Sequence, residues 1–256
     1  MELWQIKAAE KMSYLLSEHL TTNKIELSGS VLNPTELDKF SDVDMYIYMP
    51  TNTPINFDTL LNVLTEQFGP PFGFEIHCQN DRDVLRICFE DGQRFDLVFI
   101  YTGEKEGKAQ ISVFSDAIGK LMNQYWFISV MVLVKLGRND NLIAAHLLLE
   151  LCQTVIGIQM LIRDKKKNTN FHRFGDSEKM LMLWHLIGFS SAMSLSDDCL
   201  YQECDLIYSV LLLIARHMDK VSAEAVDNYT DKIDILRDLC NYFHPRYYKH
   251  YNKDNH

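Results

Sequence analysis

The prolines are unevenly distributed along this 256-residue chain. Five of the six lie within the first 71 residues, and only Pro245 follows them. Proline interrupts helices, because it lacks a backbone N–H and its ring clashes with the preceding turn. The first part of the chain is therefore predicted to mix strands, turns and short helices, whereas residues 72–244 can form long helices.

Apolar residues recur at helical spacing through most of the second part. Helices are predicted over residues 115–136, 140–163, 177–191, 200–218 and 222–243. We therefore expect an all-helical bundle domain over residues 111–256. Trp126 is expected in its core, and Gly137 is expected to cap the first of these helices.

The first part shows both helical and strand periodicities. Helices are predicted over residues 2–20 and 57–68, and strands over residues 24–28, 42–49, 74–78, 84–89 and 94–101. The dipeptide Asp91-Gly92 between the last two strands is typical of a hairpin turn. Residues 1–110 are thus predicted to form a mixed β-sheet with flanking helices, which gives the whole chain an α+β fold.

Composition argues against several classes of protein. The net charge of −10 disfavours non-specific nucleic-acid binding and weakly favours a cationic small substrate. The apolar runs are interrupted well before eighteen residues, and the first twenty residues contain several glutamates. We therefore expect neither a membrane span nor a signal peptide. The six cysteines form no CxxC pair and are expected to be reduced and buried, so a cytoplasmic location is predicted.

Three carboxylates occupy conspicuous positions on predicted strands. Asp42 and Asp44 open one strand and project to the same face, where two like charges repel each other. Mg²⁺ prefers such carboxylate oxygens as ligands. Asp96 lies in the middle of a later apolar strand, where an uncompensated charge is costly. Its partner is predicted to be a metal ion or a substrate hydroxyl; the alternative is a salt bridge with Arg86 or Arg94.

Gly29 and Ser30 follow the strand that precedes the two acids. Glycine allows the backbone to approach a bound anion closely, and the serine hydroxyl with neighbouring N–H groups can hold phosphate oxygens. Each residue alone could be an ordinary turn glycine or an ordinary cap. Together with the carboxylates they predict a site for a metal ion and a phosphate group.

This order of a Gly-Ser turn, an Asp-x-Asp pair and a third strand carboxylate resembles the polymerase-beta-type nucleotidyltransferase superfamily. The segment from Ser41 to Tyr48 and the helical second half are most similar to antibiotic nucleotidyltransferases of the lincosamide and aminoglycoside kinds. The likeness at the level of motifs covers roughly residues 25–100. It implies a nucleotidyltransferase-type catalytic domain followed by the helical domain.

The resemblance also implies a reaction. A nucleoside monophosphate, with ATP as the expected donor, would move to a hydroxyl of an aminoglycoside- or lincosamide-like antibiotic. Asp42, Asp44 and Asp96 would bind Mg²⁺, with Asp96 alternatively acting as the general base. Gly29, Ser30 and Lys135 would contact the nucleotide. For Lys135 the alternative is a lysine that complements the dipole at the end of its helix.

Other functions stay open at this stage. The chain could be a non-catalytic nucleotide-binding or regulatory module, although three intact carboxylates argue against this. A nucleotidyltransferase with a protein or RNA acceptor is a further alternative. The negative net charge disfavours the RNA acceptor. Tyr46 and Tyr48 would either line an acceptor pocket or pack as half-buried sheet aromatics. The apolar surface of the helical half would allow a homodimer.

Overall fold

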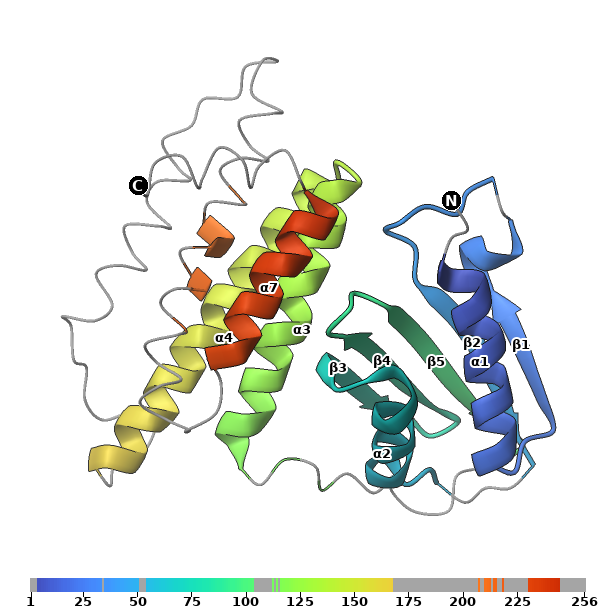
Figure 1. The fold of residues 1–256 in the computed structure, drawn as a ribbon. Coiled ribbons are helices and arrows are strands. Elements are labelled where there is room, and N and C mark those ends of the chain that lie inside the picture. Colours follow the sequence, from blue (N-terminus) through green and yellow to red (C-terminus); the bar gives the residue numbers. More distant parts are fainter. Residues whose placement is uncertain are drawn as a thin grey trace. The chain divides into compact units, whose positions relative to one another are not determined.

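The computed structural model (Figure 1) divides the chain into two compact units, Met1–Asp116 and Ala117–His256. It describes residues 4–33, 35–50, 54–103, 112, 114, 116–167, 207, 210–212, 214, 215, 218 and 230–244. Three predicted helices are affected by these bounds. The helix expected over 177–191, most of the one over 200–218 and the start of the one over 222–243 lie outside the described residues.

The first unit is built on a five-stranded mixed sheet with the order β1-β2-β5-β4-β3. The strands are β1 (Lys24–Ser28), β2 (Val43–Met49), β3 (Pro71–Cys78), β4 (Arg82–Phe89) and β5 (Arg94–Tyr101). β2 and β5 run parallel, and the other neighbouring strands run antiparallel. The predicted α+β fold with a mixed sheet and flanking helices is confirmed.

Two helices, α1 (Trp4–His19) and α2 (Phe57–Phe68), cover one face of this sheet (Figure 1). Alternate residues of the strands point to that face, and on β2 the side chains of Val43, Met45 and Ile47 are at most 1% exposed. They form one hydrophobic cluster with the apolar sides of both helices. The residues between them, including Asp44, therefore point to the opposite face, which the two helices leave uncovered.

The hairpin between β4 and β5 fixes which residues of these two strands face each other. Its loop has three residues, since the N–H of Phe89 donates to the carbonyl of Gln93 at 2.9 Å. Gly92 has φ +86°, the left-handed conformation that such loops require at their last position. The resulting register places Arg86 directly opposite Asp96.

In the second unit, the described residues form helices. α3 (Ala117–Gly137) packs against α4 (Asn141–Lys167) and α7 (Thr230–Phe243). The prediction that Trp126 lies in the core is confirmed, since it is fully buried. The predicted Gly137 cap is wrong: Asn139, with φ +58°, adopts the left-handed conformation after α3. Asparagine tolerates this conformation better than most residues, because its side chain can hydrogen-bond locally.

α3 and α4 are long and apolar enough to cross a membrane by length and composition alone, contrary to the prediction that no segment could. Within the most apolar windows, 61% of α3 and 39% of α4 is buried inside the protein. Core helices pass the same test, and α3 packs against both α4 and α7. The two helices are therefore weak evidence for a membrane span.

Candidate functional site

The three predicted carboxylates come together on the uncovered face of the sheet. Asp42 immediately precedes β2, while Asp44 of β2 and Asp96 of β5 are direct neighbours in the parallel register. One carboxylate oxygen from each residue lies within 4.8 Å of the others. All three residues are half-buried. The side chains thus form one cluster, which we call the acidic triad.

The donor set of the acidic triad fits a hard divalent cation. Mg²⁺ binds oxygens at about 2.1 Å, so that two oxygens on opposite sides of one ion are about 4.2 Å apart. The spread of 4.8 Å among the triad oxygens is slightly larger. Small side-chain rotations would therefore suffice to bring the three carboxylates onto one ion or onto two neighbouring ions.

The electrostatics of the triad point in the same direction. Burial, followed by the negative charge of Asp42 and a smaller effect of Asp44, raises the pKa of Asp96 to about 7 from its usual 3.8. The nearby guanidinium groups of Arg86 and Arg94 lower this pKa but do not offset the increase. A cation among the carboxylates would offset both the burial cost and the repulsion that raise the pKa of Asp96.

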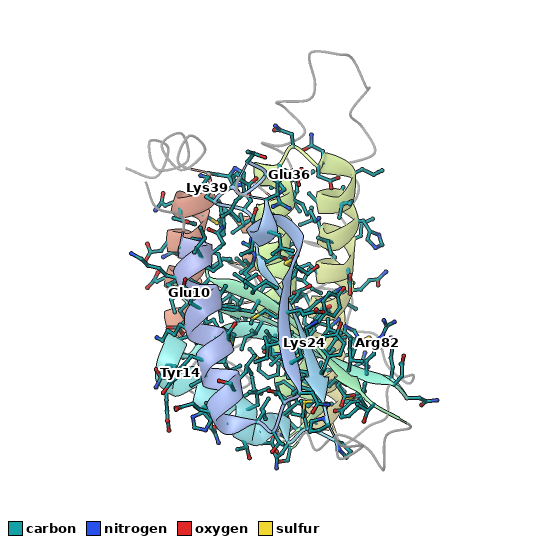
Figure 2. All side chains as sticks on the ribbon, turned by 90° about the vertical axis from the view of Figure 1, so that its right-hand side faces the viewer. Glu10, Tyr14, Lys24, Glu36, Lys39 and Arg82 are labelled. Carbon is teal, nitrogen blue, oxygen red and sulfur yellow. The ribbon has the colours of Figure 1, made fainter. Side chains whose placement is uncertain are left out.

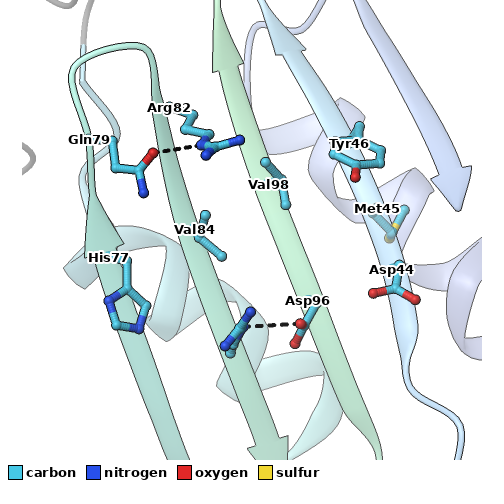
Figure 3. Close-up of a pocket in the computed structure, with 10 residues that line it drawn as sticks. Asp44, Met45, Tyr46, His77, Gln79, Arg82, Val84, Asp96 and Val98 are labelled. Carbon is cyan, nitrogen blue, oxygen red and sulfur yellow. Dashed lines mark hydrogen bonds and ion pairs between the residues drawn. The ribbon is translucent and has the colours of Figure 1, made fainter. Parts of the chain in front are cut away.

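The alternative interpretation of Asp96, a salt bridge with an arginine, also holds in part. The Nε of Arg86 lies 3.1 Å from Oδ2 of Asp96, and the Arg86 side chain is 49% exposed. Figure 3 shows this ion pair on the same face as Asp44. An ion pair with a half-exposed arginine is weak, so it does not remove Asp96 from the acidic triad. Asp96 therefore takes part in both the triad and the salt bridge.

Gly29 lies against the carboxylate of Asp44. Its φ is +66°, and a Cβ atom at this position would overlap Oδ2 of Asp44 and lie 3.2 Å from its Cγ. Only glycine satisfies both the backbone conformation and the lack of space. The predicted reason for this glycine was close approach to a bound anion; the structure gives a different neighbour, which is the carboxylate of a triad member.

Ser30 follows Gly29 in the short 3₁₀ helix η1 (Gly29–Leu32). Its backbone carbonyl accepts a hydrogen bond from the N–H of Asn33 at 3.1 Å. The Ser30 side chain makes no hydrogen bond with any other residue that the structure describes. Its contact with a phosphate oxygen stays a prediction.

The loop that carries Asp42 is anchored by two side chains to which sequence reasoning gave no such role. Nε2 of the buried Gln5 donates to the carbonyl oxygens of Asp38, at 2.7 Å, and Ser41, at 3.1 Å. A terminal nitrogen of Arg94 donates to the carbonyl of Phe40 at 2.5 Å. A signal for Gln5 was available: it is a polar residue on the apolar stripe of the first helix.

A groove of about 430 Å³ extends from the acidic triad along the uncovered face of the sheet. Tyr46 is among the residues that line it, and its contact with an acceptor stays a prediction. His77, Arg82 and Arg86 also line the groove. Sequence reasoning considered Arg86 only as a partner of Asp96 and gave His77 and Arg82 no role. The alternation of polar and apolar residues on β3 and β4 was visible in the sequence. The sequence did not show which strand would lie beside Asp96.

Lys135 belongs to the second unit, where it lies in the last turn of α3. Its backbone carbonyl accepts hydrogen bonds from the N–H groups of Arg138, at 3.2 Å, and Asp140, at 2.9 Å. The place of Lys135 at a helix C-terminus fits the interpretation that its charge complements the helix dipole. Its contact with a nucleotide stays a prediction.

Comparison with known proteins gives matches among solved structures only. No family model and no curated protein match the chain. An aminoglycoside 6-adenyltransferase from Bacillus subtilis matches 95% of this chain over 99% of its own, with 13% identity and a TM-score of 0.32. The STING-associated CdnE c-di-GMP synthase from Capnocytophaga granulosa matches 95% of this chain over 79% of its own, with 12% identity and a TM-score of 0.27. The CdnC:HORMA-deltaN complex from E. coli MS115-1 matches 93% of this chain over 88% of the matched chain, with 14% identity and a TM-score of 0.25.

Proposed function

We propose that the protein is a magnesium-dependent nucleotidyltransferase that moves a nucleoside monophosphate onto a hydroxyl of a small molecule, with ATP as the expected donor. The observation that supports this most strongly is the acidic triad, whose oxygens lie within 4.8 Å of one another beside the turn at Gly29. Residues 1–110 would act as the catalytic domain, and residues 111–256 as a helical domain that supplies Lys135.

Each triad member has a proposed role. Asp42 and Asp44 hold Mg²⁺, which when bound neutralises charge on the triphosphate and on the leaving group. Asp96 is either a third ligand or the general base, and a pKa of about 7 suits a base that works near neutral pH.

The proposed transfer exchanges one phosphorus–oxygen bond for another. The acceptor oxygen forms a bond to the α-phosphorus, and the bond from that phosphorus to the bridging oxygen of the pyrophosphate group breaks. Pyrophosphate leaves with the electron pair of the broken bond, and the hydroxyl proton passes to Asp96. Gly29 and Ser30 would contact the phosphates beside the triad, where Gly29 keeps the backbone close to Asp44.

Asp44→Asn tests the proposal directly, because it preserves the shape of the side chain and removes its charge. We expect this variant to lose magnesium-dependent pyrophosphate release while keeping its circular dichroism spectrum. Glu10→Gln is a matched control that also removes one negative charge; Glu10 lies on α1, on the side of the first unit away from Arg82 (Figure 2). Undiminished turnover by Asp44→Asn would refute the role of the triad.

The identity of the acceptor is tested with a panel of candidate compounds. Nucleoside triphosphates labelled at the α-phosphorus should be offered with an aminoglycoside, a lincosamide, a protein mixture and RNA, and the labelled products identified. An antibiotic acceptor is predicted by the sequence resemblance. A protein or RNA product would instead support the alternative acceptors.

The cytoplasmic location and the homodimer also stay predictions. Sedimentation of the full chain measures whether it forms a dimer.

A non-catalytic module is the alternative outside enzymes. It predicts that calorimetry detects binding of a nucleoside triphosphate with Mg²⁺ while no acceptor gives a labelled product. The enzyme predicts both binding and product. The two proposals therefore differ in one measurement, and the Asp44→Asn variant should weaken nucleotide binding in either case.

A further inference from the structure

The groove on the uncovered face has two chemically different ends. The acidic triad lies at one end, and Arg82 lies at the other (Figure 3). Arg82 and Arg86 are four residues apart on β4, on the same face. This separation corresponds to about 13 Å along the strand. A ligand whose hydroxyl is beside the triad can therefore place a second group near Arg82.

The middle of the groove is apolar and flanked by rings. Val84 and Val98 face each other in the register of β4 and β5 and form the floor. Tyr46 lies beside Val98, and His77 lies beside Val84, so that a ring borders each side. Tyr46 is 39% exposed, which leaves its ring accessible to a ligand. Such a floor suits a sugar or another ring as the body of the ligand.

The charges that face the groove are positive once a metal ion is bound. Asp44 and Asp96 are the carboxylates among its described lining residues, and the proposed function uses both at the metal. Arg82 is held by Gln79, whose Oε1 accepts from its Nε at 2.7 Å. The terminal nitrogens of Arg82 and Arg86 make no hydrogen bond or ion pair with the residues that the structure describes. They are donors suited to an anion.

We propose that the acceptor carries an anionic group, a phosphate or a carboxylate, that binds Arg82 while the acceptor hydroxyl lies at the acidic triad. This inference rests on the proposed function and names the substrate class for it. A cationic acceptor, which the net charge of the chain weakly favoured, would meet two arginines in this groove. Glu75, which lies 3.4 Å from His77, is a carboxylate beside the groove, but it is not part of the lining.

A panel of paired acceptors tests the proposal. Each pair consists of a neutral hydroxyl compound and its phosphate monoester or carboxylate, such as glucose with glucose 6-phosphate or with glucuronate, and an aminoglycoside is added as the cationic arm. We expect kcat/KM to be about tenfold higher for an anionic member than for its neutral partner. The phosphate and carboxylate arms show which anion the groove prefers. A preference for the neutral or cationic acceptors would overturn the proposal.

Arg82→Gln locates the effect. In this variant the ratio of kcat/KM between anionic and neutral partners should fall towards one. Lys11→Gln, which removes a positive charge from α1 on the covered face, should leave that ratio unchanged. A ratio that survives Arg82→Gln would show that the anion binds elsewhere. A raised KM for the nucleoside triphosphate, with an unaltered ratio, would assign Arg82 to the donor instead.

A binding measurement keeps the groove testable if no acceptor gives a product, an outcome that would overturn the proposed function. Inorganic phosphate is titrated into the protein in the presence of Mg²⁺, and the Nε–H resonances of the arginines are followed by nuclear magnetic resonance. A saturable shift of the Arg82 resonance supports an anion site in the groove. If the Arg82 resonance does not shift, the proposal is wrong whatever the acceptor panel gives.

Discussion

Gly29 and Asp44 are so close that a single methyl group on the glycine would overlap the carboxylate of the aspartate. Gly29 also has φ +66°, a conformation that other residues rarely adopt. The turn before the β1–β2 loop is thereby fitted to a triad side chain. The close approach of Gly29 restricts where the carboxylate of Asp44 can point.

Gly29→Ala is expected to reduce both stability and magnesium-dependent turnover. The positive φ costs about 1 kcal/mol for alanine, and the displaced carboxylate of Asp44 would no longer match its neighbours. Gly69→Ala is the matched control, since Gly69 has φ +87° but no atom within 4 Å of its Cβ position. Chemical denaturation should show a cost in both variants, and turnover should fall only in Gly29→Ala. Equal turnover in the two would contradict the role of this contact.

Asp96→Asn is expected to stabilise the metal-free protein near neutral pH. The pKa of Asp96 is about 7 in the folded state and near 3.8 in the unfolded chain. The folded state therefore binds more protons between these values, and stability is lost as the pH rises through about 7. Asparagine carries no charge to repel, so the variant should gain on the order of 2 kcal/mol at high pH after allowance for solvent screening.

Urea denaturation at pH 4 and pH 8.5 with a chelator present measures this effect. The stability of wild type and variant should differ little at pH 4 and should diverge at pH 8.5. Glu66→Gln, which removes an exposed carboxylate from α2, should show no such divergence. A variant that loses stability equally at both pH values would indicate that the salt bridge with Arg86, and not repulsion within the triad, dominates at Asp96.

Much of the first unit could be predicted from the sequence. The alternation of Val43, Met45 and Ile47 with polar residues determined which face of β2 is buried, so Asp44 was placed correctly. The helix over 57–68 was predicted with its observed bounds. These features are local, since each depends on the periodicity of one segment and on the residues that end it.

The groove could not be predicted, because it depends on pairing between strands. A two-residue turn at Asp91-Gly92 would have placed Ile87 opposite Asp96, whereas the three-residue loop places Arg86 there. A shift of the strand pairing by one residue would therefore replace an arginine with an aliphatic side chain opposite Asp96. The parallel pairing of β2 with β5 likewise could not be predicted, since no periodicity reveals strand order. The expectation that Asp96 acts together with Asp42 and Asp44 came from the family resemblance.

Gln5→Leu is expected to weaken the response to magnesium. The buried amide of Gln5 donates hydrogen bonds to the carbonyl oxygens of Asp38 and Ser41. Leucine would leave both carbonyl oxygens without this donor, which should cost about 1–3 kcal/mol of stability. Because Ser41 is adjacent to Asp42, the loop would also hold this ligand less firmly. We expect the magnesium concentration for half-maximal turnover to rise. Glu10→Gln, on the exposed side of the same helix, is the control; an unchanged magnesium requirement would restrict Gln5 to a structural role.

Tyr101→Phe is expected to destabilise the first unit through a buried carboxylate on the covered face of the sheet. The side chain of Asp83 is fully buried, and its Oδ2 accepts from the hydroxyl of Tyr101 at 2.5 Å. The same hydroxyl accepts from the N–H of Ile55 at 3.2 Å, which ties the segment before α2 to the sheet. Burial and the hydrogen bond to Asp83 both raise the pKa of Tyr101, so this hydroxyl remains a donor throughout the working range.

Removal of the hydroxyl would leave a buried acceptor and a buried N–H with one partner fewer, at a cost of about 2 kcal/mol. Tyr14→Phe is a close control, because the hydroxyl of Tyr14 also donates to a carboxylate, that of Glu18, at 2.5 Å, but on an exposed surface. Water replaces that partner, so Tyr14→Phe should change the free energy of unfolding by about 0.5 kcal/mol at most. Equal effects in the two variants would mean that burial adds nothing to the Tyr101–Asp83 hydrogen bond, and the segment before α2 would then be held by its apolar contacts alone.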